Sequence, residues 1–379
     1  MRRLRPLLCG LLLAACGQRA ARPIGDFTLP VYTPRYASGF EITGAAGSRS
    51  TLVTVHNPWY GDEVTDQYLF IARDGEPAPA GFEGQVLRDE TRRVVCMSGS
   101  YIAMLDALGA ADRVVGVSGA QYLINETLRR RIARGEAADV GFDSNVDFER
   151  LMALRPDLVM LFGIGGADTA LTGKLRELGI PYLYMGEHCE ESPLGKSEWV
   201  VVAAEIAGLR TEGSRLFAAI PERYERLRAL AQQTAARPRV MLNTPYRDTW
   251  FMPARNSYMV RLLEDAGARY VFEENTATQT LPIDIEQAYY LTSKSDFWLN
   301  VSGCNTLDEV RRQNPRLADT PPVREGRVYD NNRRRNAAGG SDFWESGVLR
   351  PDRVLADLVH IFHPELSETD ELYYYRQLE

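Results

Sequence analysis

The chain has 379 residues, of which 44 are basic and 51 are acidic, so its formal net charge is −7 at pH 7. This acidic balance argues against nucleic acid as a partner, because binding a polyanion needs clustered positive charge. The length allows two units that each bury a core. The five cysteines include no CxxC pair, so a zinc site or a thioredoxin-like site is unsupported.

The first fifteen residues have the pattern of a bacterial export signal. Met1 to Arg5 is basic, and Pro6 to Leu13 is mostly apolar but too short for a stable membrane span. Leu13-Ala14-Ala15-Cys16 then matches a lipobox, in which the Cys16 thiol takes the lipid. The alternative is an ordinary secretory signal that happens to contain a cysteine. We predict a signal peptide over 1–15 and a periplasmic protein that Cys16 anchors to a bacterial membrane.

Two segments precede the first regular alternation of strands and helices. Residues 16–38 contain scattered Pro, Gly and Arg, which predicts a linker rising from the membrane. Residues 39–90 contain short alternating segments separated by turn-rich pieces such as Asn57-Pro58 and Asp74-Gly75. This pattern predicts a small β appendage.

From Arg92 onward, short apolar runs alternate with helical segments. The predicted strands cover 93–97, 114–117, 158–162 and 181–184. Ser98 can cap a helix that runs to Leu108, and Gly179 ends a later one. Short strands that alternate with helices imply a parallel sheet, so we predict an N-terminal α/β lobe over 91–196.

A long, largely helical stretch follows over 197–236, with interruptions near Gly208 to Gly213 and at Pro221. At about 1.5 Å per residue it could bridge two lobes, or it could be a core helix of one large domain. Strand–helix alternation then resumes, which predicts a C-terminal α/β lobe over 237–363 and a tail over 364–379. The predicted fold class is α/β, with two lobes that contain central parallel sheets and a long rigid helix between them.

Two distant stretches look like copies of one another. Asp147 to Leu154 precedes the apolar run 158–162, and Asp284 to Leu291 precedes the run 297–301. Each reads as an acidic residue, a short helix, a polar break and a buried strand. Glu149 and Glu286 occupy the same place in the two copies, which suits docking to a two-fold partner. The alternative is that each is only a favourable acid near a helix N-terminus.

At these residues the chain resembles the periplasmic substrate-binding proteins of ATP-binding-cassette importers for iron chelates, haem and vitamin B12. The resemblance covers about residues 91–363 and implies two α/β lobes with the ligand between them. It also implies a permease dimer with its ATPase as partner, whose arginines would pair with Glu149 and Glu286. The matching pieces are Arg93-Val94-Val95, Ala107 to Ala110, Arg113 to Val117, Asp147 to Met160, Leu262 to Gly267 and Asp284-Ile285-Glu286.

The resemblance also implies where a ligand would be contacted. A chelate or tetrapyrrole is large and flat, so aromatic walls with a few polar anchors are expected. An aromatic core and a solvated arginine run are the alternative interpretation. Cleft positions of the family fall in loops at strand ends, and here those loops supply Tyr122, Phe142, Tyr246, Trp250, Arg255, Arg333, Arg334, Asp342 and Trp344.

A ferric siderophore is the first expectation for the ligand, with haem and corrinoids as alternatives. Haem-binding relatives use a tyrosine near Tyr122 as an iron ligand, although Leu123 stands where a proline is usual. Corrinoid binders carry a tryptophan where this chain has Thr280-Leu281, and Phe142 stands where their first-lobe tryptophan would be. We expect a monomer with no resident cofactor.

Other classes of protein have little support in the sequence. Gly163-Ile164-Gly165-Gly166 follows a strand, but Asp168 replaces the third glycine of a dinucleotide fingerprint, and no P-loop, GxSxG or HExxH pattern occurs. A metal site at His188-Cys189 is disfavoured, because adjacent residues do not easily face one ion. We therefore expect no enzyme and no metal site. An exported chelate-processing enzyme and a scaffold protein remain alternatives, and a Cys96–Cys189 disulfide stays open.

Overall fold

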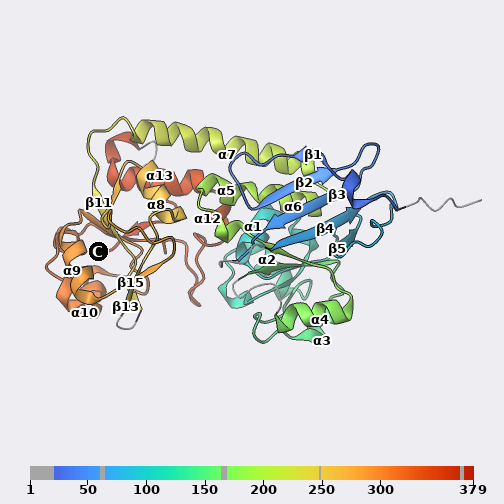
Figure 1. Cartoon of the computed structure of the whole chain (residues 1–379). Helices are drawn as coiled ribbons and strands as arrows, with labels where there is room; N and C mark the ends of the chain where they lie inside the picture. Colours follow the sequence, from blue (N-terminus) through green and yellow to red (C-terminus); the bar gives the residue numbers. More distant parts are fainter. Residues whose placement is uncertain (1–20, 60–64, 164–168, 247–248, 368–370) are drawn as a thin grey trace, which may run out of the picture.

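A computed structural model describes residues 21–59, 65–163, 169–246, 249–367 and 371–379. The predicted signal peptide and Cys16 lie outside the described residues. Two α/β lobes stand side by side, and the long helix α7 (Arg210–Ala231) runs along one side of both (Figure 1). This confirms the predicted fold class. In the part of the chain that is described, no helix is long and apolar enough to cross a membrane.

The first lobe is built on a parallel sheet with strand order β10-β9-β6-β7-β8. Its buried runs of Val, Leu and Met are typical of strands covered on both faces. The strands are β6 (Val94–Cys96), β7 (Val114–Val117), β8 (Ala138–Asp139), β9 (Leu158–Phe162) and β10 (Tyr182–Met185). The accompanying helices are α1 (Gly99–Ala107), α2 (Glu126–Ala133), α3 (Phe148–Ala153) and α4 (Ala170–Leu178).

The second lobe has a similar sheet with strand order β14-β11-β16-β17-β18, in which only the last pair is antiparallel. A smaller antiparallel sheet, β12-β13-β15, lies beside it. The strands are β11 (Arg239–Leu242), β12 (Pro245–Tyr246), β13 (Thr249–Met252), β14 (Arg269–Tyr270), β15 (Leu281–Ile283), β16 (Phe297–Leu299), β17 (Val328–Asp330) and β18 (Arg376–Gln377). The helices are α8 (Tyr258–Asp265), α9 (Ile285–Ser293), α10 (Leu307–Gln313), α11 (Pro321–Arg324), α12 (Ser346–Leu349) and α13 (Pro351–Phe362).

The predicted tail is wrong, because residues 371–379 belong to the second lobe. Strand β18 pairs with β17, and Tyr374, Tyr375 and Leu378 are buried. The Asp357 carboxylate on α13 accepts the backbone N–H groups of Tyr373, Tyr374 and Tyr375 at 2.7, 2.6 and 3.0 Å. One buried side chain therefore fixes the segment that precedes β18.

The prediction of a linker over 16–38 is also wrong for residues 21–38, which the structure describes. Phe27 is buried, and β1 (Leu29–Tyr32) pairs with the first strand of the β appendage. Backbone N–H groups of Arg35, Tyr36 and Ala37 then bind the Glu198 carboxylate at 2.8, 2.7 and 2.7 Å. The chain is therefore part of the folded body from about residue 27.

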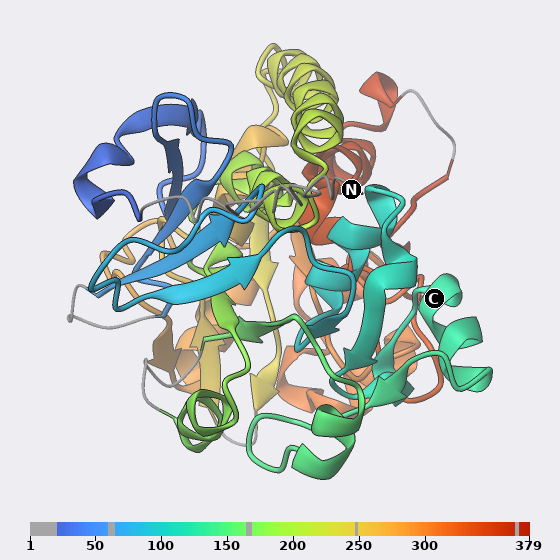
Figure 2. The ribbon, with the colours of Figure 1, turned by 90° about the vertical axis from the view of Figure 1, so that its right-hand side faces the viewer.

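The N-terminal sheet has five strands in sequence order, β1, β2 (Phe40–Gly44), β3 (Thr51–His56), β4 (Asp66–Ala72) and β5 (Gln85–Arg88). Figure 2 shows it in blue, lying directly against the first lobe. Phe40, Val53 and Leu69 belong to the same buried cluster as first-lobe residues such as Val94 and Leu183. The sheet thus shares a hydrophobic core with the first lobe and is not a separate appendage.

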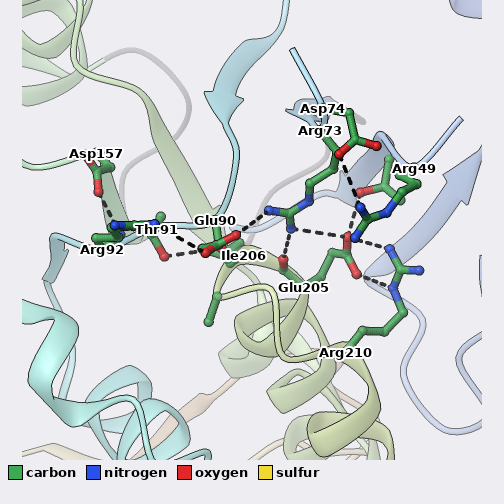
Figure 3. Close-up of polar contacts among 12 residues, drawn as sticks. Arg49, Arg73, Asp74, Glu90, Thr91, Arg92, Asp157, Glu205, Ile206 and Arg210 are labelled. Carbon is green, nitrogen blue, oxygen red and sulfur yellow. Dashed lines mark hydrogen bonds and ion pairs between the residues drawn. The ribbon is translucent and has the colours of Figure 1, made fainter. Parts of the chain in front are cut away.

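Polar contacts reinforce this junction (Figure 3). Glu205 on helix α6 (Val200–Ile206) is buried, and its carboxylate accepts hydrogen bonds from Thr51 at 2.7 Å and from Arg210 at 2.8 Å. Arg73 donates to the backbone carbonyl of Glu205 at 2.9 Å, and Thr91 N–H donates to that of Ile206 at 3.1 Å. The N-terminal sheet, the first lobe and the connecting helices are therefore one packed unit.

The predicted interlobe helix is a series of three helices. Helix α5 (Pro193–Glu198) is followed by α6, which ends before Gly208, and then by α7. Gly208 has a φ of +68°, a conformation that glycine adopts readily, so this predicted break is confirmed. The predicted break at Pro221 is wrong, because α7 is one helix of 22 residues that continues through Pro221.

Candidate ligand site and docking surface

The two lobes meet through loops that follow the carboxyl ends of their sheet strands. Residues 119–125 follow β7 in the first lobe and contact residues 336–345, which follow β17 in the second lobe. On another part of the junction, Asn256 donates a hydrogen bond to Glu191. A ligand held between the lobes would be contacted by these loops, because binding sites in parallel α/β sheets lie at the carboxyl ends of the strands.

Tyr122 and Phe142 lie together on the first-lobe side of this junction. Each is 44% exposed, and their ring centroids are 6.3 Å apart. The Asp139 carboxylate, at the end of β8, accepts N–H groups from Gly119 at 3.2 Å, Ala120 at 2.7 Å and Gly141 at 2.9 Å. One side chain thereby ties the starts of both loops together, and the two rings lie side by side. Their contact with a ligand stays a prediction.

The second lobe contributes Trp344, which is 60% exposed and packs edge-on against Phe343 with a centroid distance of 4.7 Å. Arg334 bonds the buried Asp342 at 2.6 Å, and its guanidinium lies 4.6 Å from the Tyr373 ring centroid. Arg333 pairs with Glu371 at 3.2 Å. Trp344 is thus an exposed ring on the segment that contacts the first lobe, whereas Arg333 and Arg334 are engaged within their own lobe.

Three other predicted contacts belong to the second lobe. Trp250 is 1% exposed and donates its indole N–H to the Leu242 carbonyl at 2.9 Å, so its ring packs in the core. Arg255 pairs with Glu264 of α8 at 2.8 Å. Tyr246 is exposed on β12, in the small antiparallel sheet.

Glu149 and Glu286 occupy equivalent places at the starts of α3 and α9. The Asp147 side chain caps α3 by accepting the Arg150 N–H at 2.9 Å, and Asp284 caps α9 by accepting the Gln287 N–H at 2.7 Å. Each glutamate is exposed in the first turn of its helix, and each helix leads to a strand of the central sheet, β9 or β16. The predicted repeat is therefore present in the fold.

The two glutamates differ in their surroundings. Glu286 pairs with Arg316 at 3.2 Å, and both side chains are largely exposed. A hollow of about 340 Å³ beside them is lined by Trp250, Ile285 and Arg316, among other residues. Within the described residues, Glu149 has no ion pair of this kind. The carboxylate of the first lobe is therefore the more freely presented of the two.

A buried ionisable cluster that no local sequence pattern marks lies at the end of β10 in the first lobe. Glu187 follows β10 and accepts the Ser100 hydroxyl at 2.9 Å, and burial raises its pKa to about 7. Lys196 donates to the backbone carbonyls of Glu187 and His188 at 2.8 and 3.0 Å. Burial lowers the pKa of His188 to about 4, so its imidazole is neutral near pH 7. Together these hydrogen bonds stabilise the backbone that follows β10.

Neither a metal cluster nor a disulfide involves the described residues. No group of three or more His, Cys, Asp or Glu side chains among them could hold a metal ion. Cys96, Cys189 and Cys304 are free thiols, so the Cys96–Cys189 disulfide left open by the sequence is not formed. Burial raises the pKa of the Cys189 thiol to about 11, which keeps it protonated near pH 7.

A second hollow, of about 270 Å³, lies between α7 and α13. It is lined by Arg223, Arg226, Arg350 and Arg353, and Asp352 bonds two of them. Neither this hollow nor the one beside Glu286 is lined by Tyr122, Phe142 or Trp344. Tyr122, Phe142 and Trp344 therefore belong to neither hollow.

Two α/β lobes with a long connecting helix and equivalent exposed carboxylates define a two-lobed binding protein of the class III type. Comparison with known proteins agrees with this class, because residues 94–333 match the periplasmic binding protein family. That match covers more than half of the chain, so the protein belongs to this family. Its members bind solutes for ABC permeases and are not enzymes.

Individual relatives are distant. An uncharacterized lipoprotein of Methanocaldococcus jannaschii is 25% identical over 332 residues, which cover 82% of this chain and 77% of the relative. A haem-binding protein of Pseudomonas aeruginosa has a TM-score of 0.59 at 19% identity and covers 76% of this chain and 98% of its own. The haem-binding protein RhuT of Roseiflexus has a TM-score of 0.57 at 21% identity, with 72% and 98% covered.

A solved structure from an Fe³⁺-hydroxamate transport system of Saccharomonospora viridis is also similar. Its TM-score is 0.53 at 17% identity, and the alignment covers 72% of this chain and 94% of the other. At these identities the likeness shows the fold alone.

Proposed function

We propose that this chain is a lipid-anchored, monomeric binding protein that captures a ferric siderophore between its lobes and delivers it to an ABC importer. The observation that carries the ligand class is the set of exposed aromatic rings at the lobe junction, Tyr122 and Phe142 from one lobe and Trp344 from the other. A large chelate with flat or apolar faces gains most from such rings, because each buries a large area and loses few rotamers.

Haem is the second candidate, and one observation favours it. Tyr122 is 44% exposed at the junction, so its phenol oxygen could reach a ferric iron carried by the ligand. Two of the similar solved structures are haem-binding proteins by name. A siderophore that already saturates its iron would use Tyr122 only as an aromatic and hydrogen-bonding surface.

Docking to a permease dimer would use Glu149 and Glu286. Each carboxylate is exposed in the first turn of a capped helix, one on each lobe. A basic residue on each permease half would find one carboxylate at an equivalent place, which fixes the orientation of the complex. The anchor at Cys16 would keep the protein near its permease, and the relative in Methanocaldococcus jannaschii is itself described as a lipoprotein.

Tryptophan fluorescence of the full chain, purified in detergent, tests the ligand proposal. Haemin, cobinamide and a panel of ferric siderophores would be titrated separately. We expect saturable one-to-one quenching by one class. In Trp344→Phe most of that quenching should disappear, because Trp344 is the exposed tryptophan at the junction. The matched control Trp298→Phe replaces a fully buried indole and leaves Trp344 in place, so most of the quenching should remain. Absence of quenching by every compound would contradict the ligand class.

A further inference from the structure

A loop of the second lobe reaches across the junction and holds the backbone on both sides of Tyr122. The Asn336 side-chain amide donates to the carbonyl of Gln121 at 2.9 Å and to that of Leu123 at 3.1 Å. The amide oxygen of Asn336 accepts N–H groups from Ala338 at 3.1 Å and Gly340 at 2.9 Å. Because both ends of this amide are bonded, its orientation is fixed and it donates only toward the first lobe.

The same loop touches Tyr122 itself. A Cβ atom placed on Gly340 would lie 1.7 Å from the Tyr122 carbonyl oxygen and 2.9 Å from its Cα. No side chain fits at that distance, so the two backbones approach closely only because residue 340 is glycine. The second lobe therefore packs directly against the backbone of Tyr122.

Glu345 completes the contact. Its carboxylate accepts the N–H groups of Ile124 at 2.9 Å and Asn125 at 2.6 Å, and the residue is only 5% exposed. It also packs on the start of α1, where a Cβ on Gly99 would lie 3.2 Å from its Cγ. Asn125 in turn caps α2 by accepting the Leu128 N–H at 2.9 Å. The end of the Tyr122 loop is thus fixed at the point where α2 begins.

Two carbonyls and two N–H groups between Gln121 and Asn125 are therefore satisfied by side chains of the other lobe. Three of these four bonds are partly buried, so the loss of their partners would release the loop locally. The loop's own lobe holds its start, through Asp139 and the turn in which Tyr122 N–H bonds the Gly119 carbonyl at 2.9 Å. It also holds the end of the loop, where the Asn125 side-chain amide donates to the Asp106 carboxylate at 2.8 Å. The second lobe supplies the side-chain partners between these two points, on both sides of Tyr122.

We propose that Asn336, Gly340 and Glu345 are positioning residues, through which the second lobe sets the place of Tyr122 in the ligand site. The proposal rests on the proposed function in so far as Tyr122 contacts the ligand. The aromatic surface of the first lobe is complete only while this contact between the lobes is made. Loss of the contact lowers ligand affinity although none of the three residues has to touch the ligand, because the site is no longer preorganised.

The first test needs no ligand. Amide hydrogen exchange of residues 119–126 would be compared in the full-length wild type, Asn336→Ala, Glu345→Gln and the control Asn256→Ala. Asn256 also bonds across the junction, to Glu191, but does not touch this loop. We expect exchange in 119–126 to be at least tenfold faster in Asn336→Ala, with a smaller rise in Glu345→Gln, whose amide oxygen still accepts one N–H. Unchanged exchange in both variants would overturn the proposal.

The second test measures binding of haemin and of a ferric hydroxamate siderophore to the same variants. Asn336→Ala should weaken the Kd of the bound compound about tenfold, and Asn256→Ala should stay within twofold of wild type. In a Tyr122→Ala background the additional effect of Asn336→Ala should vanish, because the two changes act through one side chain. Faster exchange with unchanged affinity would overturn the positioning role. If the wild type binds neither compound, the proposed function fails, while the exchange data still decide whether the loop is held from the second lobe.

Discussion

Each lobe secures one end of the chain with a single buried carboxylate. In the first lobe, Glu198 of α5 accepts three consecutive backbone N–H groups from residues 35–37, next to the added strand β1. In the second lobe, Asp357 of α13 accepts three consecutive N–H groups from residues 373–375, next to the added strand β18. Different helices and different segments form the same arrangement, so a segment without apolar periodicity can be fixed by a side-chain acceptor together with a short strand pairing.

The two anchors differ in what they support. Glu198 also accepts the Tyr32 hydroxyl at 2.8 Å and holds a segment that leads into a whole five-stranded sheet. Asp357 holds a segment that supplies one edge strand, and burial raises its pKa. The first lobe therefore depends more on its anchor than the second lobe does.

Removing the anchors should give the largest effects. Glu198→Ala and Asp357→Ala each remove the acceptor of three buried or partly buried backbone hydrogen bonds, at ~1–3 kcal/mol for each N–H group that stays buried and unpaired. We expect the free energy of unfolding to fall by about 4 kcal/mol in Glu198→Ala and by somewhat less in Asp357→Ala. Urea unfolding of the full chain measures both losses.

The exposed Glu212, in the first turn of α7, provides the control Glu212→Ala. This change should alter stability by less than about 0.5 kcal/mol. Limited proteolysis sharpens the comparison, because Glu198→Ala should expose the N-terminal segment and Asp357→Ala the C-terminal one. A loss below about 1 kcal/mol in both anchor variants would contradict the role given to these carboxylates.

The two anchors also explain why the linker and the tail were predicted wrongly from the sequence. The strand–helix alternation and the repeated Asp147 and Asp284 units are local patterns, so the lobes could be predicted from them. The linker and tail were wrong because their partners are not local: Glu198 lies 161–163 residues from residues 35–37, and Asp357 lies 16–18 residues from residues 373–375. No local pattern marks such an acceptor. Glu345 was missed for the same reason, since its N–H donors belong to the other lobe.

Trp250 was predicted to contact the ligand, although the alternation of side chains along a strand could have placed it in the core. Along β13 the exposure alternates, with Trp250 and Met252 buried and Phe251 outward. Successive side chains of a strand point to opposite faces, so a strand over 249–252 would have put Trp250 and Phe251 on different sides. Tyr122 and Phe142, in contrast, follow strands of a parallel sheet, and the structure brings them together as their loop positions suggested.

The junction between the lobes should respond to pH through Glu345. Its pKa is raised from the usual 4.5 to about 7, mainly by burial and also by Asp342 and Asp106, although the N–H groups of Ile124 and Asn125 oppose the rise. The neutral form is therefore favoured in the folded state. Its stabilising contribution is fully present below about pH 4.5 and is lost as the pH rises through about 7.

Glu345→Gln stays neutral at every pH, so it isolates this contribution. The unfolding free energy of Glu345→Gln minus that of the wild type should grow by about 2 kcal/mol between pH 4.5 and pH 8. Urea unfolding at several pH values measures this difference, and Glu325→Gln, at a more exposed carboxylate, provides the control. A difference that does not change with pH would contradict the raised pKa.

Charge reversal should compare the two lobes as docking sites. Glu149→Arg and Glu286→Arg each place a like charge opposite the basic residue expected on the permease, and each should weaken the complex about tenfold. Stimulation of the permease ATPase in lipid nanodiscs measures the effect. Glu177→Arg, at an exposed residue of α4, should leave the stimulation unchanged. A loss at only one of the two glutamates would show that one lobe alone docks through its carboxylate.

The smallest expected effect comes from Arg316, whose ion pair with Glu286 distinguishes the proposed docking site of the second lobe from that of the first. Arg316 bonds Glu286 at 3.2 Å with both side chains largely exposed, so Arg316→Ala should change stability by less than about 0.5 kcal/mol. The same change removes the ion pair of Glu286. Its carboxylate can then bind the basic residue expected on the permease without first losing its bond to Arg316. We therefore expect permease binding two- to threefold tighter in Arg316→Ala, and unchanged binding when Arg316→Ala is added to Glu286→Gln. Weaker binding in Arg316→Ala would mean instead that Arg316 itself contacts the permease, and the second lobe would then dock through a mixed-charge surface while the first docks through Glu149.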